Sequence, residues 1–132
     1  MQLKQDCVRY VLLSLEEQKF NMIIFGANDT DIATKLADDR FSTDDIRYTL
    51  FELFSGGFIT AEITNFKNDY LLRVTSITWS GHELLDDIRD TEVWRKTKDV
   101  TSSFSSISVS ILKNVATAVI TGIIKQKTGL PL

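Results

Sequence analysis

The stretch from residue 29 to residue 77 constrains the fold of this 132-residue chain most strongly. It begins with two short helical patterns, residues 29–38 and 43–56, separated by a four-residue turn; Asp29 or Thr30 can cap the first and Ser42 or Thr43 the second. Two β-rich runs follow, FITAEIT and YLLRVTSIT, and the polar turn NFKND between them predicts a β-hairpin. This order is typical of a winged helix-turn-helix, with residues 57–77 as the wing. A three-helix bundle with an incidental hairpin is the main alternative.

Helical patterns also flank this stretch. We expect a first helix over residues 3–18, a short strand over MIIF (22–25), and a helix from Trp79 with a break near residue 90. A last helix, 111–127, should end at Gly129. The predicted fold class is α+β and mainly helical: a winged helix-turn-helix with a hairpin wing and appended C-terminal helices. The predicted division is a winged-helix domain (1–100), a serine-rich connector (101–106) and an apolar C-terminal helix for docking or dimerisation (107–128).

Composition indicates an ordinary globular protein, with 43% hydrophobic and 25% charged residues. The single cysteine, Cys7, lies in an apolar helical run, which favours a buried core residue and a reducing compartment. The first residues include acids and lack a small-residue cleavage site, and no run reaches the ~18 apolar residues of a membrane span. We therefore expect a cytoplasmic protein without integral membrane association.

Two segments resemble a known family. "TWSGHELLDDIRDTEVWRKTK" at 78–98 resembles the signature of domain-of-unknown-function family 2513, found in bacteria and phages, and "FSTDDIRYTLFELFSGGFITA" at 41–61 resembles its preceding segment. One departure is Thr49, where the family pattern suggests histidine after Tyr48. The resemblance implies a winged-helix-like protein often encoded on mobile elements. It implies no activity.

The only histidine, His82, lies four residues before Asp86 and next to Glu83, which is similar to part of a helical zinc motif. A zinc site needs about three protein ligands, and no second histidine or cysteine cluster supplies them. Gly56-Gly57 lacks the lysine of a phosphate-binding loop, and Ser80 lacks the glycine two residues earlier that a nucleophile elbow requires. We therefore predict no catalytic residues, metal or cofactor, and expect His82 to pack or hydrogen-bond locally.

The winged-helix pattern makes DNA binding in regulation, on a phage or other mobile element, the leading functional hypothesis. Helix 43–56 would enter the major groove, and the candidate contacts are Lys35, Arg40, Ser42, Thr43, Arg47, Tyr48 and Lys67. Acidic residues weaken this hypothesis, because residues 27–75 contain nine acidic and five basic side chains. The alternative is a protein–protein interaction module, directed at a phage or host partner, that uses the same scaffold without touching DNA.

The apolar C-terminal helix predicts a homodimer. Val109, Leu112, Ala116, Val119 and Ile123 follow the 3-4-3-4 spacing of a coiled-coil seam. Ile111, Val115, Ile120 and Ile124 add a second apolar flank, so we expect burial on two sides, one against a second subunit. Complete burial inside one monomer and in-plane membrane contact helped by Lys113, Lys125 and Lys127 are the alternatives.

Overall fold

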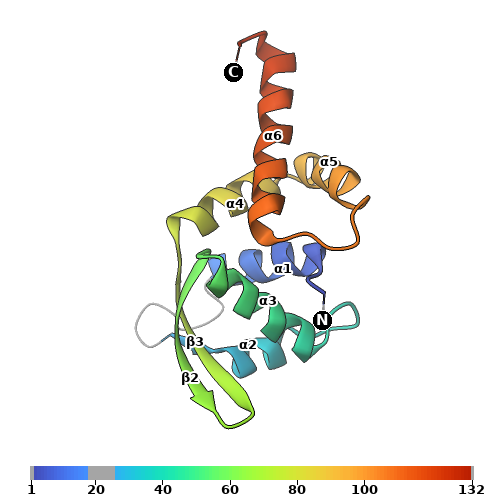
Figure 1. The fold of residues 1–132 in the computed structure, drawn as a ribbon. Helices are drawn as coiled ribbons and strands as arrows, with labels where there is room; N and C mark the ends of the chain where they lie inside the picture. The colour runs from blue at the N-terminus through green and yellow to red at the C-terminus, as the bar shows by residue number, and fades with distance from the viewer. Residues whose placement is uncertain (1, 18–25, 132) are drawn as a thin grey trace.

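A computed structural model describes residues 2–17 and 26–131 of the chain. Within them are six helices and one small antiparallel sheet, which lies at one side of the molecule, so the α+β, mainly helical class is confirmed (Figure 1). The elements are α1 (Gln5–Glu16), β1 (Ala27–Asn28), α2 (Asp29–Leu36), α3 (Thr43–Ser55), β2 (Ile59–Phe66), β3 (Asp69–Ile77), α4 (Trp79–Arg89), α5 (Thr91–Thr101) and α6 (Val109–Thr128).

The sheet has the strand order β1-β3-β2, and both pairs are antiparallel. The β2–β3 hairpin is confirmed, but its turn is shorter than the predicted NFKND. Phe66 pairs with Asp69, so only Lys67 and Asn68 form the turn. The strand expected at 22–25 lies outside the described residues, and β1 begins at Ala27, where it pairs with Val74 of β3.

Helices α2 and α3 lie where the sequence predicts them, but only one of the predicted caps is confirmed. Ser42 caps α3: its side chain accepts from the Asp45 N–H, and the Asp45 side chain accepts from the Ser42 N–H. The N-cap of α2 is Asn28, without a side-chain cap bond. Asp29 and Thr30 are therefore not caps. Asp29 is instead the first helical residue, and its carboxylate is buried, where it pairs with Arg47 of α3.

The core lies between α1, α2, α3, the base of the hairpin and α4. Its fully buried members include Val11, Leu12, Leu50, Leu84 and Leu85, and Cys7 is buried among them as expected. Helix α1 is tied to α4 and α5 by polar contacts: Arg9 donates to the carbonyls of Ile88 and Arg89 in α4, and the Trp94 indole of α5 donates to Asp6. The sequence run 78–98 thus folds onto the N-terminal helix.

The start of α4 closes the base of the hairpin. Thr78 donates its N–H to the Phe58 carbonyl and its hydroxyl to the Gly57 carbonyl, and its hydroxyl oxygen caps α4 at the Gly81 N–H. Trp79, the first residue of α4, takes no part in this closure and is 80% exposed. Gly81 is helical, and it is needed for space, because an added Cβ would lie 2.1 Å from the Phe58 carbonyl oxygen.

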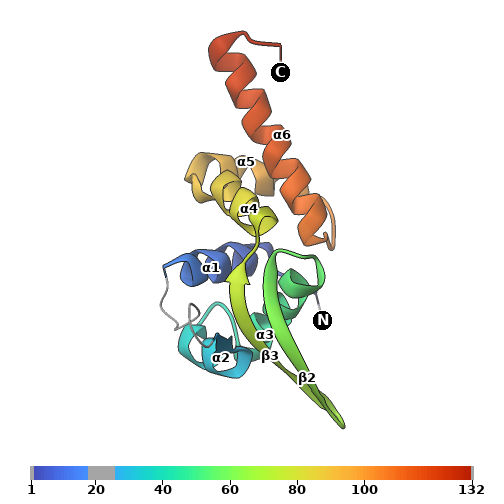
Figure 2. The same cartoon turned by 90° about the vertical axis from the view of Figure 1, so that its left-hand side faces the viewer.

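The break near residue 90 is confirmed. Helix α4 ends at Arg89, α5 begins at Thr91, and Asp90 between them caps α5 by accepting from the Val93 N–H. Helix α6 begins against α4 and α5 and then projects away from the body, at the end of the molecule opposite the hairpin tip (Figures 1 and 2). It ends at Gly129, which has the left-handed φ of 71° that suits glycine.

Candidate interaction surface on helix α3 and the hairpin

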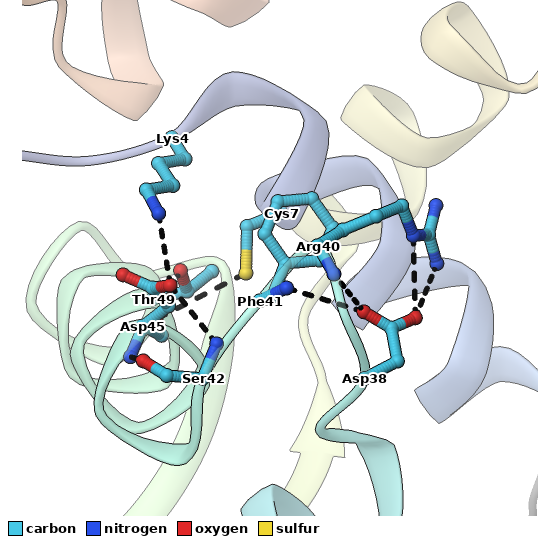
Figure 3. Close-up of polar contacts among 8 residues, drawn as sticks. All are labelled: Lys4, Cys7, Asp38, Arg40, Phe41, Ser42, Asp45 and Thr49. Atoms are coloured by element: carbon cyan, nitrogen blue, oxygen red, sulfur yellow. Dashed lines mark hydrogen bonds and ion pairs between the residues drawn. The ribbon is translucent and has the colours of Figure 1, made fainter.

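The turn between α2 and α3 holds Arg40 in an ion pair. The Asp38 carboxylate accepts from the backbone N–H groups of Arg40 and Phe41 and from the Arg40 guanidinium, with the shortest charged contact at 2.8 Å (Figure 3). The bond from the Arg40 side chain holds the pKa of Asp38 below its ordinary value. The guanidinium also lies 4.6 Å from the centre of the Tyr10 ring. The charge of Arg40 is therefore paired within the turn.

The first turn of α3 is anchored to α1. Lys4 donates to the Asp45 carboxylate at 2.9 Å, and this bond, helped by the Ser42 N–H, lowers the pKa of Asp45 (Figure 3). Thr49, one turn further, is buried and donates to the Asp45 carbonyl. The position where the family pattern suggests histidine is thus an internal packing position in this chain, on the side of α3 that faces α1.

The middle of α3 carries a buried ion pair. Arg47 donates from Nε to the Asp29 carboxylate at 3.1 Å, and the carboxylate is fully buried. Asp29 also accepts from the Leu72 N–H of β3 at 3.3 Å. The second arm of Arg47 donates to the Tyr70 carbonyl at 2.8 Å and reaches Asp69 at 3.4 Å. This pair joins α2, α3 and β3. Arg47 is the only basic residue of α3, so no other basic side chain of this helix faces solvent.

The outward side of α3 is acidic and aromatic. Asp44, Tyr48 and Phe51 are three or four residues apart and so share one side of the helix, with Glu52 beside them. Phe51 packs against Tyr70 of the hairpin with tilted rings, 5.0 Å between ring centres. Ile63 lies across from Leu72 and is 41% exposed, on the same side of the hairpin as Tyr70. We call this surface the α3–hairpin face; its residues are Asp44, Tyr48, Phe51, Glu52, Ile63 and Tyr70.

The hairpin adds little basic charge to this face. Arg73 pairs with Glu62, its direct cross-strand neighbour, at 2.5 Å. Lys67 is exposed at the hairpin tip, next to Phe66, which is 59% exposed. The three arginines between residues 27 and 75 therefore each pair with a carboxylate of the same chain.

The predicted nucleic-acid contacts do not form one basic surface. Arg40 and Ser42 lie together in the turn, Thr43 is exposed at the start of α3, and Tyr48 is half-buried on its outward side. Lys35 is exposed on α2, and Lys67 stands at the distant hairpin tip. Sequence reasoning missed the role of Asp29 and the aromatic pair Phe51–Tyr70. The aromatic pair could have been found from the alternation of side chains along β3, because it places Tyr70 on the same side as buried Leu72.

The other candidate groups lie apart from this face. His82, expected to pack or hydrogen-bond locally, is exposed on α4 and so is not packed in the core. Among residues 2–17 and 26–131, no cluster of histidine, cysteine or acidic residues could hold a metal ion. Burial raises the pKa of the Cys7 thiol, which disfavours the reactive thiolate. Of the helices that the structure describes, none has the length and apolar character to cross a membrane.

A cleft of about 410 Å³ lies between α1 and the α2–α3 turn. Its polar side chains bond within the chain: Tyr10 donates to the Leu36 carbonyl, Arg40 pairs with Asp38, and Asp6 accepts from the Trp94 indole. The cleft therefore aims none of these groups at a ligand.

The predicted dimer seam is divided by the fold. Val109, Leu112 and Ala116 are buried in the contact of α6 with α4 and α5. Val119 and Ile123 lie on the projecting half and are only partly covered. Within the described chain, the first half of the seam therefore packs inside one monomer.

Comparison of the sequence with known protein families and proteins identifies the family. Residues 2–108 match the model of the family described as "Hypothetical protein (DUF2513)". The chain is also 32% identical over 119 residues to a protein of Haemophilus influenzae described as "Uncharacterized protein", an alignment that covers 87% of this chain and 92% of the relative. No solved structure matches the chain. The chain belongs to the DUF2513 family, as the run at 78–98 predicts, and the family match ends just before α6.

Proposed function

We propose that this chain is a non-enzymatic winged-helix protein whose α3–hairpin face binds a protein partner with a basic and apolar surface. The observation that carries the proposal is the state of Arg47. It is the only basic side chain on α3, and it is bound to the fully buried Asp29.

The winged-helix part of the proposal is supported by topology. Helix α1, strand β1, helices α2 and α3 and the hairpin follow in the order typical of that fold, and β1 joins the sheet beside β3. In such a fold α3 and the hairpin form the exposed reading surface.

The magnitudes of the two ion pairs favour a protein partner over DNA. Removing one partner from a buried pair costs about 3–5 kcal/mol, so Arg47 is not available to a phosphate. The exposed Arg40–Asp38 pair is screened by solvent, contributes little to stability and can open. One arginine would not compensate for Asp44 and Glu52 on the same side of α3, since DNA binding depends on neutralising several phosphates.

The chemistry of the face defines the partner. Tyr48, Phe51 and Ile63 offer apolar contact area of the kind that anchors interfaces, and Asp44 and Glu52 offer carboxylates. A partner with lysine or arginine beside leucine or aromatic side chains complements both parts.

A peptide-display selection tests this proposal. Random 16-residue peptides are selected on the wild-type chain and counter-selected on the variant Asp44→Lys with Glu52→Lys. We expect enriched peptides rich in basic and apolar residues that lose at least ~10-fold in affinity for the variant, a change of about 1.4 kcal/mol. The matched control is Glu92→Lys with Asp99→Lys, two exposed acids on α5. Peptides that bind all three proteins equally, or acidic peptides, would contradict the proposal.

DNA binding is the second candidate, and the element order favours it. Lys35, Arg40 and Lys67 are the exposed basic residues that could contact phosphates. In this case binding would fall steeply with salt and would be lost in Lys35→Glu with Arg40→Glu. A cytoplasmic location and a phage or mobile-element origin remain predictions.

We propose in addition that the chain forms a homodimer through the projecting half of α6, whatever its α3–hairpin face binds. The apolar side chains on that half support this, and measurement of the mass in solution tests it.

A further inference from the structure

Helix α6 leaves the body of the protein halfway along its length. In the part of the chain that the structure describes, the buried residues of α6 are Val109, Leu112 and Ala116. Beyond them the helix runs clear of α4 and α5 in both views (Figures 1 and 2). The last turns of α6, with Gly129 and Leu130 after them, are therefore a projecting arm, which we define as residues 118–130.

The apolar stripe of α6 continues along this arm. Val119 and Ile120 follow Ala116 by three and four residues, and Ile123 and Ile124 follow by another turn. These four side chains lie on the same side as the buried residues, yet none is buried, and Ile124 is 38% exposed. An arm of this length is a marginal helix in water without packing. The apolar stripe therefore indicates that another surface packs against the arm.

The charges around α6 indicate what covers the arm. Residues 108–132 contain Lys113, Lys125 and Lys127 and no acidic residue. The acids lie on α4, beside the first half of α6: Glu83 reaches Lys113 at 3.5 Å, and Asp87 accepts from the Thr117 hydroxyl at 2.9 Å. A surface that offers both an apolar stripe and acids to the two terminal lysines is thus present on the protein itself.

We propose that the arm packs against the arm of a second copy in an antiparallel pair, with the two-fold axis near Thr121. This inference rests on the proposed homodimer and specifies its contacts. Positions equally far from the axis come level in an antiparallel pair, so Lys125 reaches the level of Thr117, and hence of Asp87, in the second copy. The stripe residues 119, 120, 123 and 124 then face one another across the axis.

A parallel pair does not fit these charges. It would place Lys125 and Lys127 of both copies side by side, at an end of the helix that has no acid. The antiparallel pair separates the lysines of the two copies and brings each near the acids of α4, which is electrostatically favourable. The interface is isologous and closes after two copies.

Sedimentation equilibrium tests whether the dimer exists. The weight-average mass of the full chain should rise with concentration from 15.0 kDa toward twice that value. Ile120→Asp with Ile123→Asp should raise the dissociation constant at least 100-fold. The control, Ile111→Asp, introduces one carboxylate at an exposed position on the side of α6 opposite Ile120 and should leave the dissociation constant unchanged. A mass that stays at 15.0 kDa, or equal effects of both changes, would overturn the dimer.

Single cysteines test the orientation separately, in a Cys7→Ala background. Ile120→Cys lies near the axis and should form an intermolecular disulfide. Lys127→Cys should not, because two such positions are separated by about 18 Å along antiparallel helices. Crosslinking at both positions in a protein that still dimerises would overturn the antiparallel arrangement and leave the dimer standing. Binding of the wild-type arm to anionic vesicles of phosphatidylglycerol, with a mass of 15.0 kDa in solution, would overturn both.

Discussion

At the scale of single residues, Gly81 explains part of the family signature. Its Cα lies against the backbone of Phe58, so an added Cβ would meet the carbonyl oxygen at 2.1 Å. Gly81 lies within α4 and lacks a positive φ, so the residue does not serve a turn. Close packing of helix against hairpin, which a one-dimensional pattern does not encode, is the reason for this residue.

We expect Gly81→Ala to lower the free energy of unfolding by about 3 kcal/mol, because a backbone atom cannot move aside as a flexible side chain would. Urea unfolding measures the change. Gly122→Ala is the control, since an added Cβ there meets nothing within 4 Å and alanine favours a helix. Equal stability of the wild type and Gly81→Ala would show that the contact relaxes without cost.

The Asp29–Arg47 pair gives a second prediction at this scale. Arg47→Met should lower the free energy of unfolding by about 3 kcal/mol, because it leaves a fully buried carboxylate without its cation. Adding Asp29→Asn should restore at least about 1 kcal/mol of this loss, because the uncompensated charge is removed. Chemical unfolding of the two single variants and the double variant measures the coupling. Strictly additive costs would mean that the pair is not an energetic unit.

At the scale of elements, the first turn of α3 couples its cap to α1. The pKa of Asp45 is lowered mainly by the hydrogen bond from Lys4 and then by the Ser42 N–H. A lowered folded-state pKa means that the carboxylate contributes its stability fully above the ordinary pKa of aspartate. The contribution is lost as the pH falls through the lowered value.

We therefore expect Asp45→Asn to cost about 1 kcal/mol at pH 7, a value moderated by the half-exposed Lys4, and less at pH 3. Denaturant unfolding at the two pH values gives the difference. Thr43→Ala, exposed two residues earlier, should show no such pH dependence. If Asp45→Asn cost the same at both pH values, the charged carboxylate of Asp45 would not contribute to stability as we infer.

The elements themselves were largely predictable. Apolar spacing located α1, α3, α4 and α6 to within a few residues, and Ser42 was correctly expected as a cap because capping depends on neighbours in sequence. The predicted cap of α2 was wrong because Asp29 bonds to Arg47 and Leu72 instead. These partners are 18 and 43 positions further along the chain. The charge of the candidate surface was mispredicted for the same reason. The sequence shows its arginines, but it does not show that each one pairs with a carboxylate of the same chain.

At the scale of the whole molecule, the described chain places its charges unevenly. The α3–hairpin face is acidic and aromatic at one end, and the arm of α6 is basic and apolar at the other. Helix α1 joins the two through contacts such as the Arg89–Glu16 pair, whose bond lowers the pKa of Glu16. Each end has a different chemistry, so we assign the α3–hairpin face to a partner protein and the arm to a second copy.

The most direct test of the central claim is a titration of labelled duplex DNA of mixed sequence, followed by fluorescence anisotropy at about 50 and 200 mM salt. Our proposal of a protein-binding face predicts no binding tighter than about 100 μM at the lower salt concentration, the weak limit of non-specific DNA binding. It would be contradicted by tighter binding that weakens steeply at the higher salt concentration and disappears in Lys35→Glu with Arg40→Glu.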